Sequence, residues 1–404
     1  MEWKEVTLGE ISSKIGDGLH GTPKYDDEGP YYFINGNNLN CGKIIIKDDT
    51  KRVGIDEFVK NQKELNEQTL LVSINGTIGN VAKYNNEPCI LGKSACYINV
   101  IKEVDKEFIY YVLTSANFKR NITNEATGTT IKNVSLKQMR EYKFNIPCNI
   151  ADQRRIASIL SSLDRKIELN NKINADLEEM AQAIFKNWFV DFEPFKDGKF
   201  VDSELGMIPE GWKVGCLGDM GNIVCGKTPS KANSNYYGGD IPFIKIPDMH
   251  GNVFVENSED RLTEEGSLSQ IKKLIPPYSL MVSCIATVGL VSINTKPSHT
   301  NQQINTVIPH NKSALFYLYQ HIKNNEEFLK NMGRGGTTTL NVNTKSFSNI
   351  RLLIPSEIAL DQFHGIVEGL FKKIELNMHE SRTLSLLRDT LLPRLMSGEL
   401  EVPE

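Results

Sequence analysis

Apolar residues recur at intervals of seven in two stretches of the chain, each about four to five heptads long. The first position of the repeat is filled by Ile156, Leu163, Asn170, Leu177 and Ile184 in one stretch, and by Phe363, Leu370, Asn377, Leu384 and Leu391 in the other. The second position is assigned to Leu160, Ile167, Ile173, Met180 and Trp188, and to Val367, Ile374, Leu387 and Leu395. Such seams are typical of paired helices in a coiled coil. The pattern therefore predicts two long helices, and antiparallel pairing is the simplest path between them.

An asparagine occupies the same heptad position near the middle of each predicted helix. Antiparallel pairing would bring Asn170 and Asn377 together. A polar residue buried in an apolar seam lowers stability but fixes register and orientation. Two solvated asparagines at the edge of the seam are the alternative. Their matched positions favour the register role.

Short apolar runs between loops rich in Gly, Asn and Lys precede each predicted helix. Residues 70–78 and 280–288 are rich in strand formers and bounded by glycine, a pattern typical of buried strands. A shorter helix is predicted after each run, with Asp105 and Ser313 as N-caps. Sheet-rich mixed α/β units are the expected result.

The whole series of strands, helix and turn occurs twice. Gly-Thr-Thr at 128–130 returns at 336–338 (336 − 128 = 208), and Leu-Leu-Val-Ser at 70–73 returns as Leu-Met-Val-Ser at 280–283 (280 − 70 = 210). A repeat this long exceeds the roughly 20 to 50 residues of a solenoid module. We therefore predict an α+β fold with two pseudo-repeated mixed α/β domains, separated by two long helices that form an antiparallel coiled coil. The predicted boundaries are 1–147 for the first domain, 148–192 for the first helical spacer, 193–207 for a connector, 208–355 for the second domain, and 356–404 for the second spacer and C-terminal tail.

Composition places the chain among ordinary globular proteins. It has 404 residues, of which 40% are hydrophobic and 24% charged, and no apolar run reaches the roughly 18 residues of a membrane span. The seven cysteines show no C-x-x-C spacing, which favours a reduced, cytoplasmic chain without a zinc site. The net charge of −4 argues against a simple electrostatic nucleic-acid binder, but the acidic excess lies in the helical stretches.

The motifs of common enzymes are missing from the sequence. Residues 16–21 match G-x-G-x-x-G, but Pro23 follows at once and no helix pattern begins there, so a dinucleotide loop is not expected. The chain has no phosphate-binding loop with a Gly-Lys-Ser/Thr ending and no H-E-x-x-H motif, and its histidines lack metal-ligand spacing. We expect no catalytic residue, no cofactor and no metal in this chain.

Polar residues gather in loops at equivalent places of the two copies. Lys, Arg, Asn and Thr hold phosphates and read base edges, although Gly, Asn and Thr are also ordinary turn formers. In the first copy the candidate ligand-binding residues are Lys14, His20, Thr22, Lys24, Tyr25, Asn35, Asn37, Asn38, Thr129, Thr130, Lys132 and Asn133. In the second copy they are Lys227, Thr228, Ser230, Lys231, Asn235, Tyr236, Tyr237, Lys245, Arg334, Thr337, Thr338, Asn341 and Lys345.

Three segments make the chain resemble the specificity subunits of type I restriction-modification enzymes. They are GMIPEGWKVGCLGDMG at 206–221, ADQRRIASILSSLDRKIELNNKINADLEEMAQAIFKNWFVDF at 151–192, and LLPRLMSGEL at 391–400. The resemblance covers nearly the whole chain and implies a non-catalytic subunit. Each of its two target-recognition domains would read one half of a bipartite double-stranded DNA target, and the helices would set the gap between the halves.

The same resemblance implies protein partners. Methylation subunits, which bring S-adenosylmethionine, would dock on the helical regions, and restriction subunits would join them. Residues matched for docking are Asp152, Gln153, Asp164 and Trp188 in the first helix, and Asp361 and Gln362 in the second. Two residues are missing between Gln362 and the Lys-Ile-Glu-Leu that both helices share, so the helices need not dock partners equally. A protein-binding scaffold with duplicated β-rich domains is the alternative, and an enzyme acting alone is a third reading.

Overall fold

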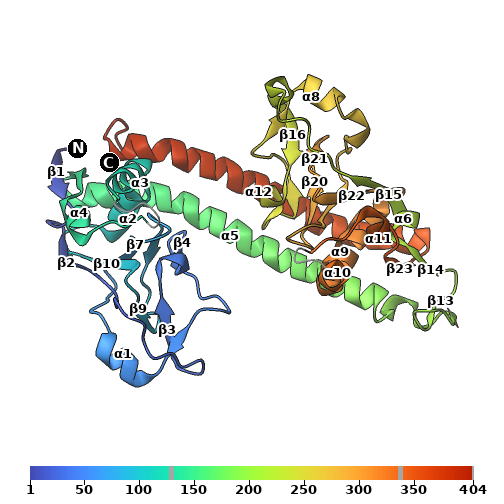
Figure 1. The fold of residues 1–404 in the computed structure, drawn as a ribbon, viewed down its shortest axis with the longest axis horizontal. Helices are drawn as coiled ribbons and strands as arrows, with labels where there is room; N and C mark the ends of the chain where they lie inside the picture. The colour runs from blue at the N-terminus through green and yellow to red at the C-terminus, as the bar shows by residue number, and fades with distance from the viewer. Residues whose placement is uncertain (127–131, 335–339, 403–404) are drawn as a thin grey trace. The chain divides into compact units, whose positions relative to one another are not determined.

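The computed structural model describes residues 1–126, 132–334 and 340–402, and these form two compact units. Unit 1 comprises residues 1–167 and 382–404, and unit 2 comprises residues 168–381. Each unit therefore contains one β-rich domain together with one part of each long helix (Figure 1).

Unit 1 is built on a sheet with the strand order β2-β10-β7-β8, and smaller sheets with the orders β1-β11, β6-β3-β9 and β4-β5. All residues of β7 and β10 are buried, which agrees with their mostly apolar sequences. The strands are β1 (Trp3–Thr7), β2 (Ser12–Asp17), β3 (Tyr31–Ile34), β4 (Leu39–Asn40), β5 (Lys43–Ile44), β6 (Arg52–Val53), β7 (Thr69–Ser73), β8 (Val81–Lys83), β9 (Cys89–Leu91), β10 (Ala95–Val100) and β11 (Lys143–Pro147).

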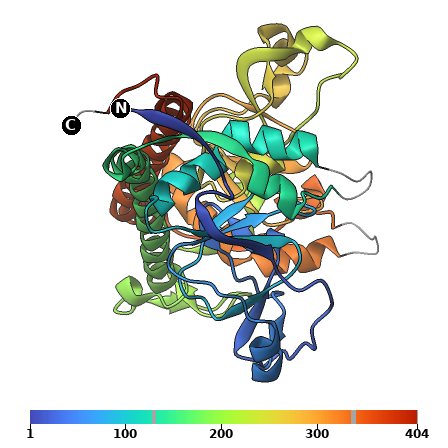
Figure 2. The same cartoon turned by 90° about the vertical axis from the view of Figure 1, so that its left-hand side faces the viewer.

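Helices α2 and α3 lie along one side of these strands (Figure 2, teal). Asp105 caps α2 as predicted, because its side chain accepts a hydrogen bond from the backbone N–H of Phe108 at 2.9 Å. The helices of this unit are η1 (Gly36–Asn38), α1 (Ile55–Asn61), α2 (Lys106–Thr114), α3 (Ala116–Glu125) and α4 (Leu136–Glu141).

Unit 2 repeats the topology of unit 1. Its main sheet has the order β15-β22-β19-β20-β17, in which the first four strands match β2, β10, β7 and β8, and β17 is an added edge strand. The sheets β14-β23 and β18-β16-β21 match β1-β11 and β6-β3-β9, and β16 pairs with β21 in parallel just as β3 pairs with β9. The duplication predicted from the sequence is therefore present in the fold.

In unit 2 two additional short strands, β12 and β13, come before the strands that match those of unit 1. The strands of unit 2 are β12 (Phe200–Val201), β13 (Ile208–Pro209), β14 (Lys213–Cys216), β15 (Gly221–Cys225), β16 (Tyr237–Ile244), β17 (Phe254–Val255), β18 (Arg261–Leu262), β19 (Leu280–Ser283), β20 (Val291–Asn294), β21 (His299–Thr300), β22 (Ile304–Pro309) and β23 (Arg351–Ile354).

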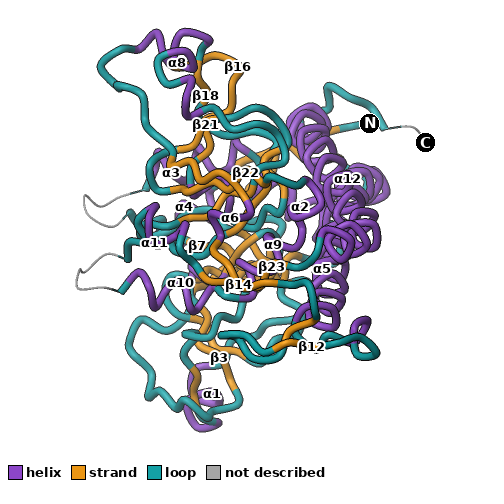
Figure 3. Tube along the Cα trace, turned by 90° about the vertical axis from the view of Figure 1, so that its right-hand side faces the viewer, coloured by secondary structure: helices purple, strands orange, loops and turns teal. Residues whose placement is uncertain are grey.

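Helices α9, α10 and α11 lie beside the strands of unit 2 (Figure 3, helices purple and strands orange). Ser313 is not the N-cap of α9: it lies inside the turn η5, whose cap is Asn311. The short helices of this unit are η2 (Glu193–Phe195), α6 (Leu217–Met220), η3 (Ser234–Tyr236), α7 (Ile246–Met249), α8 (Glu264–Leu268), η4 (Ile271–Lys273), η5 (Lys312–Ala314), α9 (Leu315–Asn324), α10 (Glu326–Gly333) and α11 (Thr344–Ser348).

The two predicted long helices are α5 (Ile150–Phe189) and α12 (Glu357–Met396). They run side by side (Figures 1 and 3), and they are antiparallel within each unit. In unit 1, Asp164 of α5 bonds Arg388 of α12. In unit 2, Asn174 bonds Asn377, and farther along α5 Phe185 packs against Phe363.

The second seam position differs from the sequence prediction. Met180 is 52% exposed and Leu387 44% exposed, so neither lies in the seam. The seam contains Asn174, Ala181, Ser381 and Arg388 instead. A search for apolar heptads passes over polar seam residues, and this is why the predicted phase drifted by one residue at these places.

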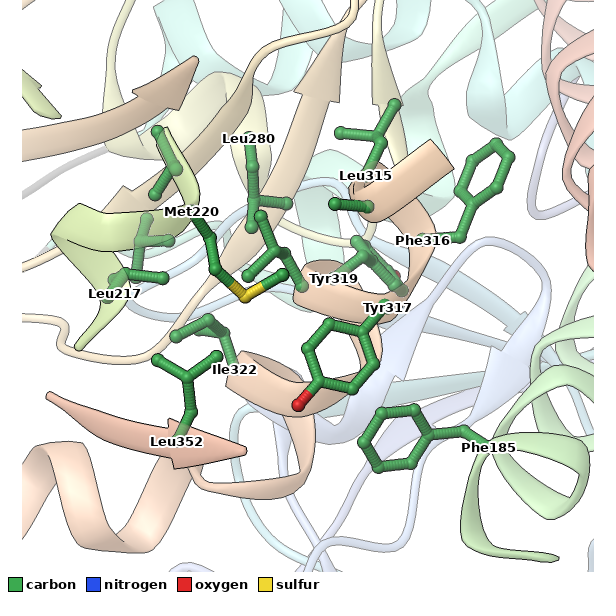
Figure 4. Close-up of a cluster of buried hydrophobic side chains, with 14 of the residues drawn as sticks. Phe185, Leu217, Met220, Leu280, Leu315, Phe316, Tyr317, Tyr319, Ile322 and Leu352 are labelled. Carbon is green, nitrogen blue, oxygen red and sulfur yellow. The ribbon is translucent and has the colours of Figure 1, made fainter. Parts of the chain in front are cut away.

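Each unit buries its own core around its part of the helix pair. In unit 2, Phe185 of α5 points toward Tyr317 of α9, and Leu280, Leu217 and Leu352 join the same cluster (Figure 4). In unit 1, Ile156 and Leu160 of α5 are buried in a cluster that also contains Leu395 of α12. The long helices are thus part of the cores of the two β-rich domains rather than separate appendages.

Candidate functional site

The first polar loop of unit 1 follows β2 and is exposed. His20 lies 2.6 Å from Asp17, between Nε2 and Oδ2, and Lys14 pairs with Glu64 at 2.9 Å, which raises the pKa of Lys14. Thr22, Lys24 and Tyr25 are exposed as well. These predicted residues lie on an accessible surface that offers cations, a hydroxyl and an aromatic ring.

The asparagines after β3 divide into exposed and structural residues. Asn37 is exposed, whereas Asn38 is only 4% exposed and donates to the carbonyl of Ile45 at 3.0 Å and to Thr50 Oγ1 at 3.2 Å. Asn35 is half-buried, and its Oδ1 accepts from the hydroxyl of Ser94 at 2.9 Å. Asn38 therefore holds its own loop together and is not on the surface that a ligand would meet.

The equivalent loop of unit 2 carries a similar set with more internal bonds. Thr228 Oγ1 donates to Gln302 Oε1 at 2.7 Å, the Tyr237 hydroxyl donates to the carbonyl of Pro229 at 2.8 Å, and Lys245 forms an ion pair with Asp260. Exposed positions of this loop are Lys227, Ser230, Lys231 and Asn235, and Tyr236 is half-buried.

The third group of predicted residues lies between α3 and α4 in unit 1, and from the end of α10 to the start of α11 in unit 2. Lys132, Asn133, Arg334, Asn341 and Lys345 are all exposed. Asn133 pairs with Asn75, whose Nδ2 donates to Asn133 Oδ1 at 3.1 Å. Asn75 was not predicted from the sequence. Its contact with Asn133 joins segments that are 58 residues apart, and such a contact leaves no local sequence pattern. Thr129, Thr130, Thr337 and Thr338 lie outside the described residues.

The helix seam of unit 2 contains a polar network around the two matched asparagines. Asn170 and Asn377 are 0% and 1% exposed. Asn170 Nδ2 donates to Glu380 Oε2 at 2.8 Å, to Ser381 Oγ at 3.2 Å and to the carbonyl of Asn377 at 3.4 Å. Asn377 Nδ2 donates to Asn174 Oδ1 at 2.9 Å. The alternative of two solvated asparagines is wrong, and the network extends to residues that the sequence reading did not name.

The two docking residues predicted at the start of α5 bond other residues of unit 1. Gln153 donates through Nε2 to the carbonyl of Pro147 at 2.8 Å and accepts at Oε1 from the N–H of Asp105 at 2.9 Å. Asp152 is 8% exposed and pairs with Arg155 at 2.7 Å. Gln153 therefore fixes the junction between domain and helix, whereas the ion pair of Asp152 lies within α5.

Asp164 joins three elements of unit 1. Its Oδ2 accepts from the Tyr111 hydroxyl at 2.6 Å and its Oδ1 accepts from Arg388 Nη1 at 2.7 Å. Burial and the hydrogen bond to Asp164 raise the pKa of Tyr111, so the phenol remains a donor. This bond network ties α2 to both long helices.

The remaining docking candidates lie in unit 2. Trp188 is half-buried, with its ring 5.6 Å from that of Phe195 and 6.1 Å from that of Phe363. Asp361 and Gln362 are exposed on α12. Of the six predicted docking residues, these two are the most accessible.

Metal sites, membrane spans and reactive thiols are the other features to consider in the described ranges 1–126, 132–334 and 340–402. Within them no group of His, Cys, Asp and Glu side chains has the geometry of a metal site, and no helix is long and apolar enough to cross a membrane. Burial raises the pKa of Cys89 to about 12 and that of Cys284 to about 11, so these thiols are poor nucleophiles.

Comparison with known proteins gives consistent matches along the chain. Residues 1–179 and 209–384 match the type I restriction modification DNA specificity domain. The chain is 38% identical over 356 residues to the specificity subunit of the type I restriction enzyme HindI of Haemophilus influenzae, covering 73% of this chain and 77% of that one. It is 28% identical over 395 residues to the MjaIX specificity subunit of Methanocaldococcus jannaschii, covering 95% and 87%.

A solved structure supports the fold. The crystal structure of a type I restriction-modification S subunit from M. genitalium superposes with a TM-score of 0.60 at 18% identity, covering 98% of this chain and 96% of that one. At this identity the likeness concerns the fold alone. It agrees with two β-rich domains accompanied by two long helices.

Proposed function

Because the chain belongs to the family of type I restriction-modification DNA specificity subunits, whose members are non-catalytic, we propose that it selects the DNA target of such a complex. In this proposal each β-rich domain reads one half of a bipartite target. The observation that carries it is the duplication: the two domains share one strand order but differ in their exposed loop residues. Two readers of the same architecture with different surfaces suit two different half-sites.

The reading surface is proposed to consist of the exposed polar residues of each unit. Lysines and arginines such as Lys24, Lys132, Lys231 and Arg334 would contact phosphates, and the neighbouring amides and hydroxyls would contact base edges. A net charge of −4 suggests weak DNA binding by the chain alone, with tighter binding once partner subunits add contacts.

The helix pair is proposed to set the gap between half-sites and to bind methylation subunits. Its exposed face in unit 2 includes Asp361 and Gln362. The methylation subunits would supply S-adenosylmethionine chemistry, and restriction subunits would complete the enzyme. This chain would orient the DNA and hold no cofactor of its own. The domain boundaries at 147, 192, 207 and 355 belong to the same proposal.

Exchange of one domain tests the proposal. Residues 208–355 are replaced by the corresponding domain of a family member with another target, and the full chain is combined with its methylation subunits. Sequencing of modified bases should show one half of the bipartite target changed and the other half kept. Methylation of unchanged sites by the chimera would contradict the proposal. Methylation without any sequence dependence on this chain would favour the protein-binding scaffold instead.

A further inference from the structure

In unit 1 the turn between β7 and β8 meets the segment before α4. The backbone N–H of Val134 donates to the carbonyl of Ile74 at 2.9 Å, and that of Gly76 donates to the carbonyl of Lys132 at 3.2 Å. The turn itself is closed by Ser73, which accepts from the N–H of Gly79 at 2.9 Å. We call residues 74–80 with 132–134 tip 1.

Unit 2 contains the same construction. The N–H of Val342 donates to the carbonyl of Cys284 at 2.8 Å, that of Ala286 to Leu340 at 3.0 Å, and that of Gly289 to Ser283 at 3.0 Å. Residues 284–290 with 340–342 are tip 2. The backbone frame is therefore kept in both copies, whereas the half-buried side chain at the matched position differs, Asn75 in tip 1 and Ile285 in tip 2.

Both tips hold a residue in the left-handed backbone conformation at the same place. Gly76 has φ 73°, which glycine adopts without strain, whereas Ala286 has φ 64°, which is unfavourable for a residue with a Cβ. Such strain tends to persist where surrounding structure serves a function. Thr77 and Thr287 follow these residues and are exposed in both tips.

Cations lie beside each tip. A Cβ built on Gly79 would be 3.4 Å from Lys119 Cγ, so the stem of this lysine lies against the turn of tip 1, and Lys132 is part of it. At tip 2 the N–H of Asn341 donates to the carbonyl of Gly333 at 3.1 Å, which brings the neighbouring Arg334 next to the tip. Exposed cations beside a rigid turn are suited to hold phosphates while the turn reaches the bases.

The side chains at the matched position differ in chemistry. Asn75 is half-buried and donates one N–H of its amide to Asn133 Oδ1. Its own Oδ1 accepts no hydrogen bond from another described residue. Ile285 takes the same place in tip 2 and pairs by backbone with Asn341, which is exposed. An amide with one donor and one acceptor fits the major-groove edge of adenine, and an apolar side chain fits the methyl group of thymine.

We propose that tips 1 and 2 are the base-reading elements of the two half-sites, with Asn75 and Ile285 as specificity-determining residues. This inference rests on the proposed function and names the part of each domain that performs it. Tip 1 reads an A·T pair through the Asn75 amide. Tip 2 reads a pair through apolar contact from Ile285.

Target mapping of substituted complexes tests this. The full chain carrying Asn75→Ile or Ile285→Asn is assembled with its methylation subunits, and modified bases are sequenced on a randomised DNA library. Each substitution should relax or change one base position in one half-site, lowering discrimination there by about 5- to 150-fold, the range of one bidentate contact. The other half-site and the gap should stay unchanged. Asn85→Ile, at an exposed asparagine of unit 1 outside the tip, is the matched control.

Asn75→Asp keeps the size of the side chain and removes its donor, so it gives the same readout if the isoleucine variant does not assemble. An unchanged bipartite target in both Asn75 variants and in Ile285→Asn would overturn the tip assignment alone. A wild-type complex without a bipartite target would instead overturn the proposed function, and the assignment with it.

Discussion

Amide side chains in the helix seam make specific bonds where apolar side chains would only pack. Asn377 Nδ2 donates to Asn174 Oδ1 at 2.9 Å, and both residues are buried. Because a buried acceptor is satisfied at one relative position of the helices, this bond favours one register. The matched position of Asn170 and Asn377 was visible in the sequence. Asn174 and Ser381 lie one heptad after Ile167 and Ile374, but they were missed because only apolar residues were assigned to the second seam position.

Replacement of Asn377 by leucine should lower the stability of unit 2. Asn377→Leu leaves the Oδ1 of buried Asn174 without its donor, which costs about 1 to 3 kcal/mol. Urea unfolding followed by circular dichroism measures the change. Asn171→Leu, at an exposed position of the partner helix α5, should stay within about 0.5 kcal/mol.

A second variant separates the lost bond from other effects of the leucine. Asn174→Leu combined with Asn377→Leu removes both partners, so it should regain most of the stability that the single substitution loses. If Asn377→Leu were as stable as the wild type, the bond would not contribute to the register.

The two long helices are equivalent in sequence only from the shared Lys-Ile-Glu-Leu-Asn onward. Counted back from Asn377, the positions of Asp152 and Gln153 are taken by Ala359 and Leu360 (377 − 18 = 359), which are buried. Asp361 and Gln362 are two residues farther along, a rotation of about 200° around a helix with 3.6 residues per turn. This places them on the exposed side, and the sequence match alone could not show it.

The same count gives Phe371 at the position of Asp164 (371 = 377 − 6, 164 = 170 − 6). In unit 1 this position holds Tyr111 and Arg388 by hydrogen bonds. In unit 2 it packs on Phe316, with ring centroids 4.1 Å apart and planes at 8°, and on the edge of Tyr319 at 5.3 Å. One copy thus joins domain and helix by polar bonds, and the other does so by aromatic packing.

Truncation of Phe371 should therefore weaken the attachment of α9 to α12. Phe371 is fully buried, and Phe371→Ala should cost about 3 to 5 kcal/mol through lost burial and the cavity left behind. Ile358→Ala, at a position 71% exposed on the same helix, should stay within about 0.5 kcal/mol. Calorimetry of the two variants measures the difference. A loss below about 1 kcal/mol for Phe371→Ala would mean that other contacts hold α9 in place.

The two repeated domains and the two long helices can be predicted from the sequence, because duplication and heptad spacing extend over many residues. A wrong assignment at a few positions does not change either pattern. The order of the strands within each sheet does not follow, since the parallel pairing of β3 with β9 depends on contacts between distant segments. Strands of two residues such as β17 carry no alternation to detect. The sequence predicted Lys132, Asn133 and Asn341 of the tips but not Asn75 or Ile285, because Asn75 and Asn133 meet only in the folded domain.

At the scale of the whole molecule, the proposed function predicts that the length of α5 and α12 determines the number of base pairs between the two half-sites. Both α5 and α12 pass from one unit into the other along the chain, α5 between residues 167 and 168 and α12 between 381 and 382. Insertion of three heptads at each of these points adds about 32 Å of helix, close to the roughly 34 Å of one DNA turn. Whole heptads keep the seam in phase, so pairing is preserved.

The gap should then lengthen by roughly nine base pairs while both half-sites stay the same, since a shift of nearly one DNA turn presents the same groove to each domain. A single heptad adds about 10 Å, or roughly three base pairs, and turns the groove by about a third of a turn, so methylation should be slower. Sequencing of modified bases on a library with varied gaps reads out both variants. Three heptads inserted into α5 alone serve as the control, because the unmatched helix breaks the seam and should abolish methylation. An unchanged gap after the matched insertion would show that the helix pair does not determine the spacing of the half-sites.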